Sequence, residues 1–215
     1  MLSELQSQLN ETYRVGGAHD VRDFLITDRS LAQLFGQDAL LSNSEETLFI
    51  AQDDDGIAMS LYLDAEMLER LESSDPLTCL QADAFADFCN VLEGISHFNC
   101  MAFKAASDRE VSLLELELQG EVDKFVSSLQ LALKQSDHEL LGYLYGWLFD
   151  NVRFHDELRG EALDRYRAAN DFASRFCYAL QQQFLLNPQA AIDELRQFFR
   201  LPIADKISHI NAKAW

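Results

Sequence analysis

Two pairs of residues in this sequence, one with a histidine and a glutamate and the other with two glutamates, have a spacing that could hold a metal ion. Glu93 and His97 are four residues apart, and so are Glu117 and Glu121. Residues four apart lie on the same side of a helix, so each pair would project together. Imidazole and carboxylates are ligands of zinc, iron and manganese, and helical bundles build such sites from inward-facing Glu and His.

The elements that must position these residues are two predicted helices. Residues 82–106 repeat apolar side chains at helical spacing. The run SLLELELQGEVDKF (112–125) alternates Leu with Glu as a strand would, but its apolar stripe continues to Leu133 only at the helical period. Ser112 followed by Glu115 has the spacing of a capping box. We therefore predict a helix for this run as well.

A short SDRE loop between the two helices predicts an antiparallel hairpin. His97 and Glu121 are each about twelve residues from the loop, so they should face each other. In a divalent-metal-dependent hydrolase built on this hairpin, Glu93, His97 and Glu121 would be ligands, and Glu117 would be a ligand or the general base.

The same residues also fit a solvated helix face. Glu93 with His97 and Glu121 with Lys124 are ordinary helix-surface pairs. With 36 Asp and Glu in 215 residues, a carboxylate at every turn is expected by chance. The spacing departs from the Glu-x-x-His of di-iron bundles, and the HExxH of metalloproteases is absent. The cofactor is therefore either none or a divalent transition metal.

The charge of −19 excludes several function classes. The sequence has no cluster of Lys and Arg, so we expect no nucleic-acid binding and no binding to anionic membrane surfaces. A basic protein partner or a divalent cation is compatible with the charge, and so is a decoy that imitates DNA. Nucleotide-binding glycine loops and the GxSxG of hydrolases are absent.

The fold class follows from long helical patterns interrupted once. Nine Gly and three Pro leave room for long elements. The exception is TLFIAQ–DDDG–IAMSLYLD (47–64), which predicts a β-hairpin. We predict a mainly α multi-helix bundle with a small N-terminal β-hairpin or sheet, with α+β as the alternative. The chain is expected to be a single domain, with a subdivision into 1–135 and 136–215 as the alternative.

Six further helices are expected, mainly from the apolar periodicity. Residues 18–36 should be helical after a break at Gly16 and Gly17, and a short helix should end before Pro76. Residues 140–149 are apolar on all sides and should form a fully buried helix. The longest periodic segment is 155–186, followed by a helix that begins at Pro188 and a last short helix that runs toward Trp215.

The compartment is predicted from the cysteines and from the chain start. Cys79, Cys89, Cys100 and Cys177 are widely spaced, which indicates reduced thiols, mostly buried, in a cytoplasmic protein. The first residues carry acidic side chains and no apolar core, so they are not typical of a secretory signal. No run of 18 apolar residues predicts a membrane-spanning helix.

Three blocks resemble an uncharacterised family of bacterial cytosolic proteins: LEGISHF (92–98), LELELQGEVDKF (114–125) and YRAANDFASRFC (166–177). The resemblance covers most of the chain from the hairpin onward. It implies a bacterial cytosolic origin and assigns no functional residue.

The sequence therefore leaves two functions open. The first is a non-enzymatic binding or regulatory protein whose acidic helical surface meets a protein partner or a second copy of the chain. The second is the metal-dependent hydrolase or metal-binding protein described above.

Overall fold

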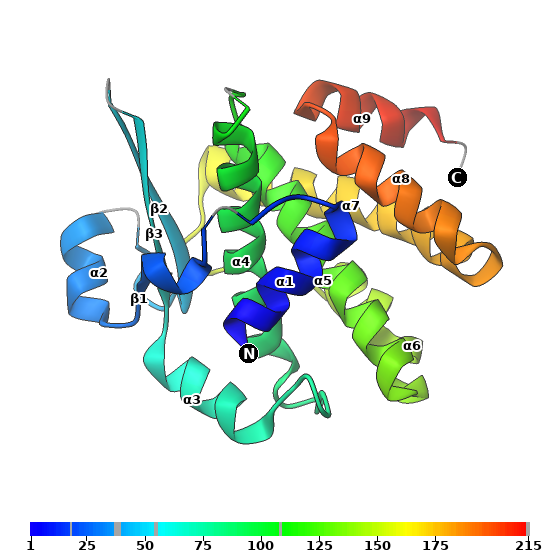
Figure 1. Cartoon of the computed structure of the whole chain (residues 1–215), viewed down its shortest axis with the longest axis horizontal. Helices are drawn as coiled ribbons and strands as arrows, with labels where there is room; N and C mark the ends of the chain where they lie inside the picture. Colours follow the sequence, from blue (N-terminus) through cyan, green and yellow to red (C-terminus); the bar gives the residue numbers. More distant parts are fainter. Residues whose placement is uncertain (18, 37–39, 54–55, 108, 214–215) are drawn as a thin grey trace. The chain divides into compact units, whose positions relative to one another are not determined.

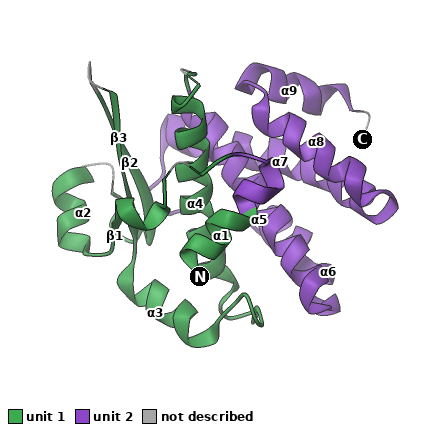
Figure 2. Ribbon diagram, viewed as in Figure 1, with its two compact units in different colours: residues 1–8, 16–110 green, residues 9–15, 111–215 purple. Residues whose placement is uncertain are grey.

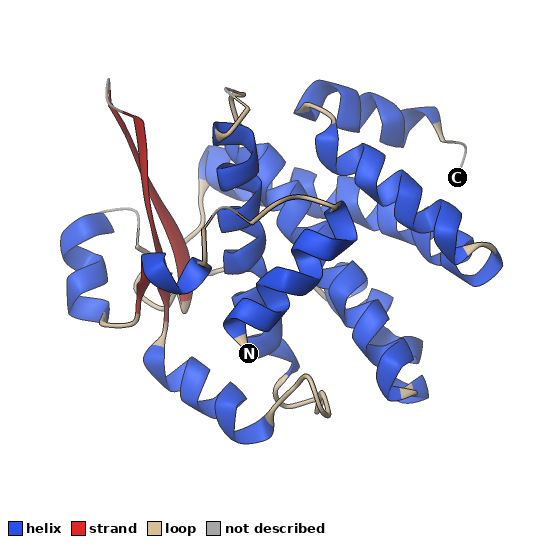
Figure 3. Cartoon of the chain, in the orientation of Figure 1, coloured by secondary structure: helices blue, strands red, loops and turns tan. Residues whose placement is uncertain are grey.

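The computed structural model describes residues 1–17, 19–36, 40–53, 56–107 and 109–213. Its elements form two compact units (Figures 1 and 2). Unit 1 comprises residues 1–8 and 16–110, and unit 2 comprises residues 9–15 and 111–215. Most described residues are helical, and strands occur only in one small sheet of unit 1 (Figure 3). The predicted mainly α fold with a small N-terminal sheet is confirmed.

Unit 1 combines the sheet with helices on both of its faces. In chain order it contains the first part of α1 (Leu2–Tyr13), a 3₁₀ helix η1 (Val21–Phe24), β1 (Leu25–Ile26), α2 (Arg29–Gly36), β2 (Glu46–Asp53), β3 (Gly56–Leu63), α3 (Ala65–Ser74) and α4 (Phe85–Ala105). As predicted, α1 ends before Gly16 and α3 ends before Pro76.

The prediction of helix throughout residues 18–36 is wrong for its first half. Asp20 caps the 3₁₀ helix η1 by accepting from the Arg22 backbone N–H at 2.9 Å. The chain then extends into β1, which pairs in parallel with β3. A long-range strand pairing has therefore overridden the local helical pattern, and only α2 remains helical.

The sheet has the strand order β1–β3–β2, and the predicted hairpin is confirmed as β2 and β3. Residues 54 and 55 of its acidic turn lie outside the described residues. Glu46 and Leu61 lie on the face that α4 covers. Phe49 is three residues after Glu46 and therefore points to the opposite face, where it meets Gly36 of α2.

Unit 2 is entirely helical in its described part. It contains residues 9–15, α5 (Leu113–Gln135), α6 (His138–Tyr145), a π-helical segment η3 (Gly146–Asp150), α7 (Gly160–Leu186), α8 (Pro188–Arg200) and α9 (Ile203–Ala212). The break predicted near residue 136 falls between α5 and α6, inside unit 2. Trp215, toward which the last helix was predicted to run, lies outside the described residues.

The ambiguous central run is helical. The Ser112 side chain accepts from the Glu115 backbone N–H at 3.2 Å, as the capping-box spacing predicts. Leu118, Val122 and Phe125 of the predicted stripe are fully buried, whereas Leu133 at its end is 51% exposed. Charged residues of α5 are also buried, which the stripe alone did not predict.

Two predictions about unit 2 are wrong in detail. Residues 140–149 are not a fully buried helix, because α6 buries Leu140 and Leu144 only and Trp147 in the following π-helical segment is 40% exposed. The long helix α7 begins at Gly160 instead of residue 155. An apolar composition on all sides indicated burial here without fixing which side chains face the solvent.

Candidate metal centre

Three potential ligand side chains come together in unit 1 between the start of β2 and the middle of α4. They are Glu46, Glu93 and His97, and one ligand atom of each lies within 4.8 Å of the others. The Nδ1 atom of His97 is 3.6 Å from Oε1 of Glu46. The side chains of His97 and Glu46 are 9% and 14% exposed, and Glu93 is half-buried. We call these three residues the Glu46 cluster.

Helix α4 supplies two of the three side chains because of its polar face. Asn90, Glu93 and His97 are spaced at i, i+3 and i+7, which places them along one side of the helix. Phe88, Leu92 and Ile95 are apolar residues of α4 that are all at most 1% exposed. The helix is therefore held with its polar stripe toward β2.

A glycine makes room for Glu46 against this stripe. Gly94 lies in the interior of α4, where glycine costs about 1 kcal/mol relative to alanine. A Cβ atom at this position would lie 2.9 Å from Cγ of Glu46 and 2.9 Å from Cδ1 of Leu61. Glycine therefore permits the Glu46 side chain to pass across the helix and reach His97.

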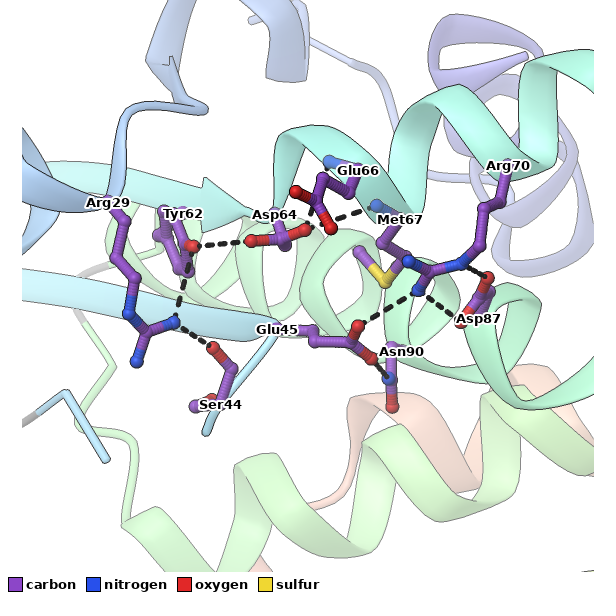
Figure 4. A network of polar contacts seen from close by, with 10 residues as sticks. All are labelled: Arg29, Ser44, Glu45, Tyr62, Asp64, Glu66, Met67, Arg70, Asp87 and Asn90. Carbon is purple, nitrogen blue, oxygen red and sulfur yellow. Dashed lines mark hydrogen bonds and ion pairs between the residues drawn. The ribbon is translucent and has the colours of Figure 1, made fainter. Parts of the chain in front are cut away.

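A network of polar contacts holds the segment that carries Glu46 (Figure 4). Arg70 of α3 donates to Oε1 of Glu45 at 2.9 Å and to both oxygens of Asp87 at 2.7 and 2.9 Å. Asn90 donates to Oε2 of Glu45 at 3.1 Å. The residue immediately before Glu46 is thereby tied to α3 and α4.

Arg29 fixes the same segment from its other side. Its guanidinium donates to the carbonyl oxygens of Leu41 and Ser44, both at 2.9 Å, and to that of Ser42 (Figure 4 shows the Ser44 contact). It also donates to the Tyr62 hydroxyl at 3.4 Å, and Tyr62 in turn donates to Asp64 at 3.0 Å. The start of β2 is thus held in place through both backbone and side chain.

The geometry of the cluster is close to that of a metal site. Ligands about 2.0–2.2 Å from a tetrahedral zinc ion lie roughly 3.4 Å from one another. The three ligand atoms, which lie within 4.8 Å of one another, would therefore approach by up to about 1.4 Å on metal binding, which rotation of the two Glu side chains can supply. Two carboxylates sharing a partly buried site repel each other, and a divalent cation between them would relieve that repulsion.

Glu117 and Glu121, the other two residues predicted for the site, lie on α5 in unit 2. Oε1 of Glu117 is 3.8 Å from Nε of Arg165, and Oε1 of Glu121 accepts from Lys124 at 2.9 Å. Among the described residues, the metal-ligand cluster includes neither of them. Their approach to His97 stays a prediction.

Unit 2 contains a second cluster of buried polar side chains, which joins three of its segments. Lys206 of α9 donates to Oε1 of Gln119 at 2.9 Å and lies 3.5 Å from Oε1 of Glu115. Gln119 donates at 3.0 Å to both Asp123 and the hydroxyl of Tyr13, and Tyr13 donates to Asp123. All five are at most 2% exposed. We call them the Lys206 network.

Burial changes the acidity of two groups in unit 2. The pKa of the Tyr13 phenol is raised well above its ordinary value, first by burial and then by the charge of Asp123. The pKa of the Cys177 thiol is raised by burial and then by the charges of Glu121 and Asp123. Both groups are therefore neutral at physiological pH, and Cys177 is a core residue, as predicted.

The comparisons with known proteins identify no relative. No family model matches the chain, and neither a curated protein nor a solved structure matches it. The resemblance to an uncharacterised bacterial family stays a prediction. None of the described helices combines the length and the apolar character that crossing a membrane requires.

Sequence reasoning found two members of the Glu46 cluster and missed the third. Glu93 and His97 follow from helical spacing, but Glu46 is distant in sequence and reaches them through the sheet. Gly94 was the feature of the sequence that could have indicated a third side chain at this site. A glycine between two candidate ligands in a strong helix indicates that another group approaches the backbone closely.

Proposed function

We propose that this protein binds a divalent transition-metal ion through Glu46, Glu93 and His97. The observation that carries the proposal is that three ligand atoms lie within 4.8 Å of one another. They do so where Gly94, which has no side chain, leaves space for Glu46 on the surface of α4. One imidazole and two carboxylates suit zinc, manganese or ferrous iron. Their combined negative charge favours a cation.

Binding, rather than catalysis, is the role we propose for the site. A hydrolase would need a general base beside the metal, and sequence reasoning offered Glu117 for that part. Glu117 is not one of the three clustered ligands, and its Oε1 lies 3.8 Å from Nε of Arg165. Three protein ligands leave a coordination position for water, so the hydrolase remains the second candidate.

The cellular setting belongs to the same proposal. Cys89, Cys100 and Cys177 are buried thiols, which supports a reducing, cytoplasmic compartment. The charge of −19 supports a protein partner or a second copy over nucleic acid.

Metal titration of the purified protein tests the proposal. Elemental analysis after incubation with zinc, manganese or ferrous iron, followed by dialysis, should give about one equivalent of one of these metals. Calorimetric titration should then show that Glu93→Gln and His97→Ala weaken binding by more than the ~10–100-fold that loss of an outer-shell partner costs. Less than a tenth of an equivalent of all three metals would exclude the proposal.

The chain offers a matched control in unit 2. His209 and Glu194 form another imidazole–carboxylate pair, with Nε2 and Oε1 3.2 Å apart, and Lys213 also contacts Glu194. His209→Ala should leave metal binding unchanged, because that carboxylate already has a cation beside it. Equal losses in His97→Ala and His209→Ala would show adventitious binding by histidine and would overturn the assignment.

A further inference from the structure

Helix α2 is packed on unit 1 through its smallest residues. Ala32 is fully buried, and a Cβ atom on Gly36, one turn later, would lie 2.2 Å from the ring of Phe49 on β2. The backbone of α2 therefore approaches the sheet closely at Ala32 and Gly36, and these two positions leave no room for larger side chains.

The large apolar residues of α2 are exposed instead. Leu31, Leu34 and Phe35 are 43%, 77% and 63% exposed. Their spacing of i, i+3 and i+4 places them next to one another on one side of the helix. We call these three residues the α2 stripe. Amphipathic helices on a protein surface normally bury such a stripe, so this helix presents its apolar side outward.

The charge around the α2 stripe indicates which kind of partner could bind to it. Asp28, at the start of α2, is exposed, whereas the guanidinium of Arg29 is held by the carbonyl oxygens of residues 41, 42 and 44. Unit 1 as a whole has 20 Asp and Glu against 5 Lys and Arg, a formal charge of −15. A second copy would bring the same charge against this surface, whereas a basic partner would be attracted.

We propose that the α2 stripe is a docking surface for an amphipathic helix of a partner protein whose apolar face is bordered by Lys and Arg. Two helices pack through apolar residues at three- and four-residue spacing, which the α2 stripe provides. The basic border of the partner would lie against the acidic surface of unit 1 and fix the orientation of the complex. This inference is independent of metal binding.

Peptide binding tests the inference without knowledge of the natural partner. The probe is a fluorescently labelled synthetic peptide of about 18 Leu and Lys residues with Leu at i, i+3, i+4 and i+7. One control peptide has the same composition in an order that forms no stripe, and another has Glu in place of Lys. Anisotropy is measured at about 0.15 M salt, where exposed charges more than ~8 Å apart are screened. The stripe peptide should bind at least tenfold more tightly than either control.

Matched variants assign the binding to α2. Leu34→Ser/Phe35→Ser should weaken binding of the stripe peptide at least tenfold, with an unchanged circular dichroism spectrum because both residues are exposed. Leu185→Ser/Leu186→Ser removes two comparably exposed apolar residues of unit 2, 73% and 88% exposed, and should leave binding unchanged. Glu93→Gln should also bind as the unsubstituted protein does, which separates this surface from the metal site.

Four results would overturn the inference. The first is equal binding of the scrambled peptide, which would reduce the effect to charge alone. The second is an absence of specific binding at α2, seen either as an equal loss in the two double variants or as no saturable binding of the stripe peptide. The third is a dimer in sedimentation that Leu34→Ser/Phe35→Ser abolishes, which would make the occupant a second copy. The fourth is binding to phosphatidylcholine vesicles that the same variant loses, which would assign the surface to lipid.

Discussion

Both units of this protein place carboxylates out of solvent, but the groups that face those carboxylates differ. In unit 2 they are the basic side chains of Lys206, Lys124 and Arg165. In unit 1 the group beside Glu46 is the imidazole of His97, which carries a charge only when protonated. Glu115, Glu117 and Glu121 of unit 2 each lie beside a cationic side chain of the chain itself, whereas the two carboxylates of the Glu46 cluster lie beside an imidazole, where we propose that an external cation binds.

The formal charges of the two units follow the same division. Unit 1 has a formal charge of −15, and unit 2 has 16 Asp and Glu against 12 Lys and Arg, which gives −4. The acidity of the chain is therefore concentrated in the unit that contains the Glu46 cluster and the α2 stripe.

The largest expected effect concerns the Lys206 network. Lys206→Met would leave Glu115 and Gln119 buried without their cation, so we expect the free energy of unfolding of unit 2 to fall by about 3–5 kcal/mol. Urea unfolding followed by circular dichroism measures the loss. Lys206→Met/Glu115→Gln should recover part of it. A loss below about 1 kcal/mol would show that unit 2 does not depend on this internal neutralisation.

The next effect concerns the space at Gly94. Gly94→Ala should lower metal affinity about tenfold or more, because the added Cβ would displace Glu46, while helix propensity offsets part of the packing cost. The matched control is Gly142→Ala in α6, where no atom lies within 4 Å of the added Cβ. It should stabilise the protein by about 0.5–1 kcal/mol with no change in metal affinity. Unchanged affinity in Gly94→Ala would contradict the proposed geometry.

A smaller effect is expected at alkaline pH and only in unit 2. The folded state raises the pKa of Cys177 and of Tyr13 above the ordinary values of 9.0 and 10.0. Their contribution to stability is therefore complete below about pH 9, begins to be lost as the pH rises through 9–10, where the unfolded chain releases both protons, and is fully lost only above the raised pKa values of the folded state. The free energy of unfolding should fall by up to ~1.4 kcal/mol per pH unit for each group.

Substitution of the thiol tests this pH dependence. Cys177→Ala should flatten the decline in unfolding free energy between pH 9 and 10, measured as urea unfolding at a series of pH values. Cys79→Ala is the control, because Cys79 is exposed and should leave the slope unchanged. An identical slope in Cys177→Ala and the unsubstituted protein would remove the thiol from the explanation.

The smallest effect is a difference in thiol reactivity. Cys79 is exposed, whereas Cys89, Cys100 and Cys177 are buried. A disulfide reagent added to the native protein at pH 8 should therefore label one thiol rapidly, and four after denaturation. Rapid labelling of more than one thiol would show that the cores of the units open under native conditions.

Local patterns predicted most of the helices and strands but failed where distant segments decided the outcome. Ser112 and the repeating Leu residues fixed the start and the buried side of α5 by interactions within one helix. Strand β1 could not be predicted in this way, because Leu25 and Ile26 are extended only by pairing with Leu61 and Tyr62. The same limit applies to α2, where Leu31, Leu34 and Phe35 follow the apolar periodicity that predicted a helix but are exposed in the structure.

The candidate site shows the same limit in the choice of ligands. Glu93 and His97 could be found by spacing along one helix, whereas the contribution of Glu46 depends on how the hairpin packs on α4. The Lys206 network was not predicted, since nothing near Lys206 in the sequence distinguishes it from a surface lysine. Its burial depends on Gln119 and Glu115, which lie on a different helix.

Helix α1 belongs to both units, and this has a consequence for synthesis of the chain. Its last turn is fixed in unit 2 by Arg196, which donates to the carbonyl of Thr12 at 2.8 Å, and by Arg200, which donates to that of Tyr13 at 2.8 Å. A ribosome adding 5–20 residues per second needs roughly 10–40 s between these segments. The second half of α1 therefore emerges first yet must wait for α8, so unit 2 completes its fold only after the chain has been translated through α8.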